Sequence, residues 1–220
     1  MIVGAVIMKQ MDIVYIITVI VVILLSMTLH EAMHAFTGYW LGDDTAKQQG
    51  RLTLNPVKHI DPFLTLLLPV MLALIGAPIF GGARPVPFNP SRVKYDEWGA
   101  ALIAIAGPLT NLLIAFVLFG IYVLCGTPQS GVLSMILLTG VMVNLGFFIF
   151  NMIPLPPLDG SRVLYALAPE FVRRGMEHVE RFGIIFIFLI VLVASPLIGS
   201  FMLTAVQFFI DIFSRIFGLS

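Results

Sequence analysis

Long apolar runs separated by short polar connectors make up most of this chain of 220 residues. The longer runs contain 17 or more residues, enough for a helix to cross the ~30 Å hydrocarbon core of a bilayer. The pattern predicts an all-α, polytopic membrane protein that forms a single domain over residues 1–220. We expect about five membrane segments: helices at 12–41, 98–124, 132–153 and 183–217, and an apolar segment at 62–80 that two prolines interrupt.

Two stretches break the helical pattern. The Gly and Pro content of residues 81–97 predicts a short β-hairpin-like insertion or a loop, and residues 154–168 place three prolines directly before Leu158-Asp159-Gly160. A hairpin would leave an unpaired edge, to which an extended peptide could add as a further strand with the N–H of Val86 among the donors. A plain linker is the alternative that the sequence leaves open.

The positive charges of the connectors predict how the segments are oriented. If 62–80 crosses the membrane, the twelve Lys and Arg divide eight to four between the two sides. If it dips in and returns, only Lys9 and Arg215 lie opposite the other ten. Because Lys and Arg concentrate on the cytoplasmic side, we favour the re-entrant arrangement. Backbone that dips into a membrane must be buried in protein or line a hydrated cavity.

The amino-acid composition indicates which large partners the chain can bind. Apolar residues make up 59% of the chain and charged residues 11%, with a mean hydropathy of +1.03, whereas a soluble chain is about 25% charged. Twelve basic side chains balance twelve acidic ones, so there is no basic surface for nucleic acid, and the lipid bilayer is the large partner indicated. The single Cys125 cannot form an internal disulfide. The oligomeric state is not indicated.

A pair of histidines at helical spacing is the first candidate for chemistry. His30 and His34 are four positions apart, so on a helix both imidazoles point the same way and can reach one metal ion. Glu31 is turned by about 100° from His30, which keeps it out of the ligand set and beside a water in the metal's open position. We therefore expect one zinc ion per chain, with Glu31 as general base. An internal hydrogen-bonded cluster of the three side chains is the simpler alternative.

A catalytic zinc needs a third protein ligand, and Asp159 is the best candidate. It follows a proline break, where the backbone can turn a carboxylate into a cavity. Asp159 could instead cap the helix that it begins, and His59 or His178 could be the third ligand, although both lie in charged connectors where surface histidines are common. Five other aspartates are less suitably placed: Asp12, Asp43, Asp44, Asp96 and Asp211.

Three asparagines, Asn111, Asn144 and Asn151, fall at membrane depth. Hydrogen bonding between helices explains such residues most simply. A supporting role at the site is equally consistent with the sequence for Asn111 and Asn144. Asn151 precedes the proline break and could orient a substrate backbone or hold the unwound segment.

The order of these motifs resembles the site-2 proteases, intramembrane zinc metalloproteases that cut transmembrane segments of other proteins. Four motifs carry the resemblance: His30-Glu31-x-x-His34, Asn55-Pro56-x-x-His59-Ile60-Asp61-Pro62, Gly107-Pro108-x-x-Asn111 and Asn151-x-x-Pro154-x-Pro156-x-Leu158-Asp159-Gly160. The resemblance implies that His30, His34 and Asp159 bind zinc and that Glu31 is the catalytic base. It also implies a three-helix core with the site near the cytoplasmic face, and we expect a multi-pass protein of a prokaryotic cell membrane.

The expected function is hydrolysis of peptide bonds in or near transmembrane segments of membrane proteins, as in regulated intramembrane proteolysis. No segment is long or polar enough for the PDZ or CBS domain of larger relatives. A metal-ion transporter or channel that uses the intramembrane His and Asp cluster is the alternative from a different class. The position of Glu31 between the histidines and the lack of an internal repeat argue against it.

Overall fold

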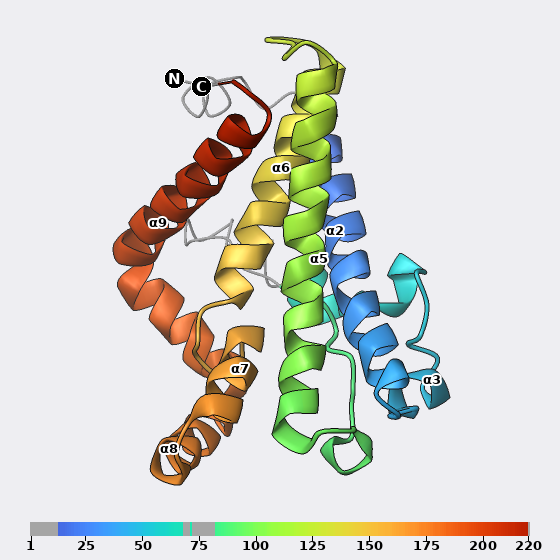
Figure 1. Cartoon of the computed structure of the whole chain (residues 1–220), viewed down its shortest axis with the longest axis vertical. Helices are drawn as coiled ribbons and strands as arrows, with labels where there is room; N and C mark the ends of the chain where they lie inside the picture. Colours follow the sequence, from blue (N-terminus) through green and yellow to red (C-terminus); the bar gives the residue numbers. More distant parts are fainter. Residues whose placement is uncertain (1–12, 68–70, 72–81, 220) are drawn as a thin grey trace.

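The computed structural model describes residues 13–67, 71 and 82–219, which form a bundle of long helices (Figure 1). In this part of the chain, four helical segments are long and apolar enough to cross a membrane. They are α2 (Ile13–Trp40), α5 (Asp96–Leu124), α6 (Val132–Asn151) and the part of α9 (Gly183–Ile216) from Pro196 onward. The expectation of an all-α polytopic membrane protein is confirmed.

Local chemistry explains where two of these helices begin and end. Helix α5 begins two residues before the expected position, because Asp96 and Glu97 fit the positive end of a helix dipole. Helix α6 ends at Asn151, two residues before the expected end, since the ring of Pro154 clashes with a helical conformation of the residue before it. Of the apolar segment 62–80, the structure describes a π-helical turn, η2 (Pro62–Leu67), and residue 71. The rest of that segment lies outside the described residues.

Helix α5 lies at the centre of the bundle and packs against α2, α6 and the short helix α7 (Asp159–Leu167). The core between α5, α6 and α9 is apolar: Ala115, Phe119, Val141, Leu145, Ile149, Val206 and Phe213. Small residues set the helix spacing, since a Cβ on Gly140 would lie 2.5 Å from Cδ1 of Leu118.

The outer surface of the bundle is apolar as well. On α5, Leu102, Leu109, Leu113 and Val117 are each about half exposed, and their spacing places them on one face of the helix. An exposed apolar stripe of this length is unfavourable in water but is covered by lipid in a bilayer. The apolar surface and the lengths of the helices therefore both indicate a protein that lies in a membrane.

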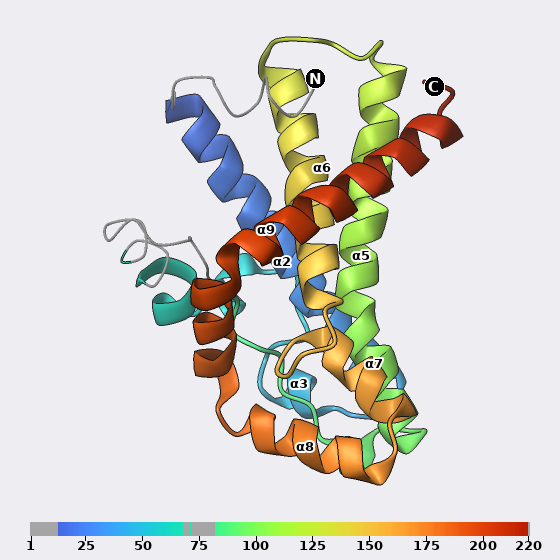
Figure 2. The same ribbon diagram turned by 90° about the vertical axis from the view of Figure 1, so that its left-hand side faces the viewer.

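Helix α9 is bent where its backbone leaves helical geometry at Ala194, two residues before Pro196. Proline has no N–H to donate and its ring crowds the preceding turn. Figure 2 shows the result, in which the second part of α9 crosses α5 and α6 diagonally. Phe213 in that part packs edge-on against Phe116 of α5, with ring centroids 5.2 Å apart.

The connectors gather at one end of the bundle. Helices α3 (Thr45–Gln48), α7 and α8 (Glu170–Glu180) all lie there (Figure 2), so most of the expected charged connector 162–181 is helical. The N–H of Lys94 donates to the carbonyl of Leu41 at 2.9 Å. The chain thus leaves α2 and enters α5 at the same end, as a re-entrant 62–80 requires.

Residues 82–89, called the strap below, run along the C-terminal half of α2 as extended chain. Within the described residues the strap forms no β-strand, so a hairpin is not seen there. The N–H of Gly82 donates to the carbonyl of Leu64, that of Arg84 to the carbonyl of His59, and that of Asn89 to a carboxylate oxygen of Asp43. The strap therefore joins the flanking turns η1 (Pro56–Lys58), η2 and η3 (Pro90–Arg92) to α2 and the loop that follows it.

The shared end of the connectors gives a testable topology. In a Cys125→Ser background, single cysteines at the exposed positions Lys47, Arg92 and Arg174 should react with an impermeant thiol reagent from one side of the membrane. The native Cys125, exposed after α5, should react from the other side. Reaction of positions 47 and 92 from opposite sides would show that 62–80 crosses the membrane.

Candidate metal centre

Helix α2 places two buried imidazoles side by side. His30 and His34 are one helical turn apart and are 6% and 8% exposed. Their rings meet edge to face with centroids 4.6 Å apart, and their Nε2 atoms are 3.0 Å apart. The two nitrogens therefore face the same small space, as the spacing in the sequence predicts.

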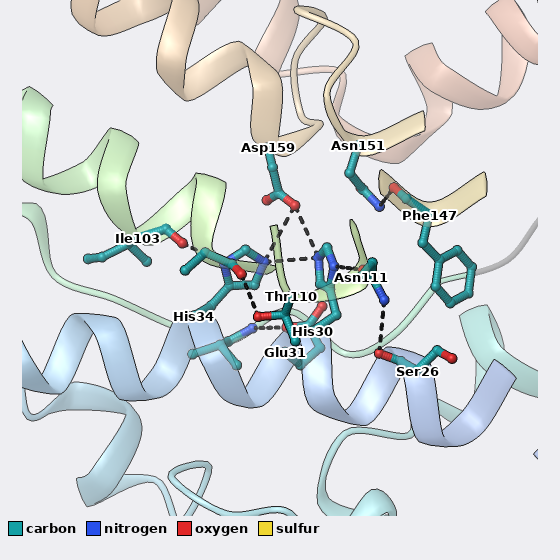
Figure 3. A network of polar contacts seen from close by, with 12 residues as sticks. Ser26, His30, Glu31, His34, Ile103, Thr110, Asn111, Phe147, Asn151 and Asp159 are labelled. Atoms are coloured by element: carbon teal, nitrogen blue, oxygen red, sulfur yellow. Dashed lines mark hydrogen bonds and ion pairs between the residues drawn. The ribbon is translucent and has the colours of Figure 1, made fainter. Parts of the chain in front are cut away.

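Asp159 enters this space from the opposite side (Figure 3). Its Oδ2 lies 3.1 Å from Nε2 of His30 and 3.4 Å from Nε2 of His34. Leu158, not Asp159, is the N-cap residue of α7, and the carboxylate of Asp159 faces the two imidazoles instead. Burial would raise the pKa of this carboxyl, but the imidazoles hold the pKa below its ordinary value.

Gly160 lets Asp159 come this close. A Cβ on Gly160 would lie 2.4 Å from the carbonyl oxygen of Met152, at the end of α6. Any side chain there would push the start of α7 away from α6. The glycine after Asp159 therefore serves close packing, which brings the carboxylate to the histidines.

A series of buried hydrogen bonds places a proton on Nδ1 of His30. Nδ2 of Asn144 donates to the carbonyl of Gly140 and to Oγ of Ser26, each at 2.8 Å. Since a carbonyl can only accept, Oδ1 of Asn144 must face Nδ2 of Asn111, at 2.8 Å. Oδ1 of Asn111 then accepts from Nδ1 of His30 at 2.6 Å, which leaves Nε2 of His30 free to bind a metal.

A backbone carbonyl orients His34 in the same way. Nδ1 of His34 donates to the carbonyl of Ile103 in α5 at 2.7 Å. Pro108, in the next turn of α5, has no N–H for the carbonyl of Ala104, so the helical ladder is interrupted beside this contact. Nε2 of His34 is thus also available to a metal.

The arrangement fits a tetrahedral zinc ion. Ligand atoms at about 2.0–2.1 Å from zinc lie about 3.3 Å from one another at tetrahedral angles, and the three atoms here are 3.0, 3.1 and 3.4 Å apart. Two nitrogen lone pairs and a carboxylate oxygen at such distances repel one another unless a proton or a metal ion lies among them. Among the described residues this is the group of His, Cys, Asp and Glu side chains that could hold a metal ion.

Gly107 forms one wall of the same space. A Cβ at this position would lie 2.4 Å from Nε2 of His34 and 2.7 Å from Nε2 of His30. Both are the atoms that face Asp159. Position 107 is therefore restricted to glycine by the room a metal needs, although alanine is the better helix former.

Glu31 lies beside the cluster, half-buried, and outside the three facing atoms. Its Oε2 accepts a hydrogen bond from the backbone N–H of Val86 in the strap at 3.1 Å. This N–H is therefore engaged inside the protein, and an added strand could not use it. The contact engages Oε2 of Glu31 and leaves Oε1 without this donor.

The other predicted residues lie apart from the three facing atoms. His59 is 1% exposed and its Nε2 donates to the carbonyl of Thr53 at 2.9 Å, so the expectation of a surface histidine is wrong. His178 is exposed on α8 and contacts Phe182. Nδ2 of Asn151 donates to the carbonyl of Phe147 in its own helix at 3.0 Å (Figure 3). Neither histidine supplies a third ligand here.

Two residues near the site were not singled out from the sequence. Ser26 lies one turn before His30 on the same face of α2, which is the only signal that could have indicated it. Arg51 is buried after α3 and contacts the strap. No local pattern marks Arg51, since it lies in a polar connector.

Comparison with known proteins gives consistent matches. The pattern that defines Peptidase family M50 matches residues 125–194. A Bacillus subtilis protein named "Putative zinc metalloprotease YwhC" is 42% identical over 192 residues, which cover 84% of this chain and 83% of that protein. "Putative zinc metalloprotease Rip2" of Mycolicibacterium smegmatis is 32% identical over 191 residues, 86% of this chain and 71% of that protein. No solved structure matches the chain.

The wall formed by Gly107 predicts a selective effect on the metal. Gly107→Ala should weaken zinc affinity about tenfold or more, as changes next to metal ligands typically do, because the new methyl group occupies the space between the ligand nitrogens. The matched control is Gly146→Ala in α6, where a Cβ meets nothing within 4 Å. The measurement is the zinc content of each purified variant. Equal zinc retention in the two variants would contradict the placement of the metal.

Proposed function

Because the chain belongs to Peptidase family M50, the site-2 proteases, we propose that it hydrolyses peptide bonds in or near the transmembrane segments of other membrane proteins, as in regulated intramembrane proteolysis. The observation that carries the proposal is the cluster of His30, His34 and Asp159, whose ligand atoms lie within 4.8 Å of one another. Glu31 follows His30 directly on α2, a helix that is long and apolar enough to span a membrane. The relatives' names support zinc as the metal.

His30, His34 and Asp159 hold the zinc in this proposal, and the remaining position is open to water and substrate. Zinc, when bound there, acts as a Lewis acid on the scissile carbonyl and lowers the pKa of a water. The Asn111 amide and the Ile103 carbonyl keep both imidazoles in the tautomer that presents Nε2. Asp159 is 23% exposed, whereas both histidines are nearly buried, so water reaches the cluster on the Asp159 side.

Glu31 is the general base. Its Oε1 takes the proton of the attacking water and passes it to the nitrogen of the leaving amine, while Oε2 stays on the N–H of Val86. No covalent intermediate is required. Asn111 and Asn144 act on the reaction only through His30. The side chain of Asn151 is hydrogen-bonded to its own helix, and it can turn toward a substrate backbone once that hydrogen bond breaks.

The position of the cluster supports a cytoplasmic site. The connectors that carry most of the Lys and Arg lie at the end of the bundle where α7 brings in Asp159 (Figure 2). Positive connectors remain on the cytoplasmic side of membranes. We therefore assign that end of the bundle to the cytoplasm of a prokaryotic cell.

One experiment tests the activity. The full chain in detergent is incubated with a peptide that contains a transmembrane segment, with and without a zinc chelator. We expect about one zinc per chain, and cleavage that the chelator abolishes and added zinc restores. Glu31→Gln should keep its zinc and lose at least about 100-fold in rate, since general acid–base catalysis contributes that much or more.

Variants of the ligands complete the test. His30→Ala, His34→Ala and Asp159→Ala should each lose zinc, because two ligands hold the ion poorly. Full zinc occupancy in Asp159→Ala would exclude Asp159 as the third ligand. Cleavage that survives both the chelator and Glu31→Gln would exclude the mechanism, and metal flux into liposomes without cleavage would favour a transporter.

The site also predicts which substrates are cut. A carbonyl reaches the cluster only from an unwound segment, because a membrane helix keeps its backbone bonded internally. A single Gly in place of Leu lowers the cost of unwinding by about 1 kcal/mol, or about fivefold in rate. Peptides with Gly, Asn or Pro in the membrane helix should thus be cut faster than uniform Leu helices. Equal rates in a kinetic comparison would show that unwinding does not limit the reaction.

A further inference from the structure

A buried arginine, Arg51, lies beside the strap and forms no ion pair with a described carboxylate. Arg51 is 4% exposed, and within the described ranges no carboxylate oxygen lies at ion-pair distance from its guanidinium. Its Nε makes no hydrogen bond. Burying an unpaired cation is costly, so a residue of this kind is retained for a reason other than general packing.

The guanidinium of Arg51 is aimed at the strap. Its NH2 group donates a hydrogen bond to the backbone carbonyl of Arg84. Its own backbone is fixed at the end of α3, since its N–H donates to the carbonyl of Ala46 at 2.8 Å. Burial lowers the pKa of the Arg51 guanidinium, while the Glu31 carboxylate opposes this shift and Arg84 adds to it. The charge of Glu31 is therefore felt at Arg51.

The hydrogen bond from Arg51 matters because only one register of the strap along α2 places an N–H opposite Glu31. In extended chain, alternate residues present their N–H and C=O groups to the same side. Arg84 bonds to His59 and Arg51, and two residues later Val86 bonds to Glu31. Val86 stands between Pro85 and Pro87, which have no N–H. A slip of one residue in either direction would leave Glu31 facing a proline.

We infer that Arg51 is a positioning residue for peptide hydrolysis: by holding the carbonyl of Arg84 it keeps the N–H of Val86 on Oε2 of Glu31, which leaves Oε1 for the attacking water. This inference rests on the proposed function, because it assigns to Arg51 a role in the work of the catalytic base. A carboxylate held at one oxygen keeps the other within the narrow geometry that proton transfer requires.

The test uses Arg51→Met, which keeps the length of the side chain and removes its donors. We expect kcat for a transmembrane peptide to fall about 10- to 100-fold, with KM nearly unchanged and one zinc still bound per chain. Arg51→Lys, which retains a charged donor, should recover part of kcat. Hydrogen–deuterium exchange of the peptide that covers the strap should show the protected amides of Arg84 and Val86 exchanging faster in Arg51→Met.

The matched control is Arg92→Met. Arg92 is about half exposed and pairs with the exposed Asp44, at the end of the same connector and away from Glu31. Exposed pairs of this kind contribute about 0–1 kcal/mol to stability. Arg92→Met should therefore retain the wild-type kcat and the wild-type exchange of the strap.

A double variant separates positioning from general loss of structure. Val86→Pro removes the N–H that Glu31 accepts. If Arg51 acts through Val86, the double variant should lose no more kcat than the poorer single variant, whereas independent effects would multiply. Should Val86→Pro fail to fold, amide exchange in Arg51→Met decides alone.

The inference is overturned if Arg51→Met keeps the wild-type kcat and strap exchange, if its loss of activity only follows a loss of zinc or folded protein, or if the losses in the double variant multiply. Absence of cleavage by the wild-type chain would instead contradict the proposed function. Amide exchange would still report whether Arg51 holds the strap, so the two failures are distinguishable.

Discussion

Polar groups buried at membrane depth must find their partners inside the protein, and this requirement shapes the whole site. The carbonyl of Gly140 can only accept a hydrogen bond, so it sets the direction of every bond from Asn144 through Asn111 to His30. Nε2 of His30 takes no part in this series of hydrogen bonds from the asparagines. The same hydrogen bonds therefore join α2 to α5 and α6 and leave Nε2 of His30 available to a metal.

The sequence predicts those parts of the site that depend on local spacing. His30 and His34 share a helix face wherever the helix lies, and Glu31 is turned away from them by the same geometry. Asp159 is predictable by elimination, since it is the one aspartate that directly follows a proline break. The apolar runs likewise predict α2, α5 and α6 because their length alone matches a bilayer.

Features that depend on contacts between distant segments could not be predicted. His59 and Arg51 lie in a polar connector and look like surface residues, yet the connector folds back under the strap and buries both. The strap has the Gly and Pro content of a hairpin, but its inner edge bonds to α2 and its neighbours instead of to a second strand. The orientation of the Asn111 amide depends on a carbonyl in another helix, which no spacing in the sequence reveals.

The place of Asp159 has a consequence for the architecture as well. His30 and Asp159 are separated by 129 positions in the chain, and α7 is held to the bundle by its own packing and by a few polar contacts. A metal ion held by both residues would cross-link α2 to a segment that follows α6. Ions that bind only the native arrangement stabilise it in proportion to their affinity. Binding of the metal would then oppose separation of α7 from α2, and assembly of the bundle and acquisition of the metal would be coupled events.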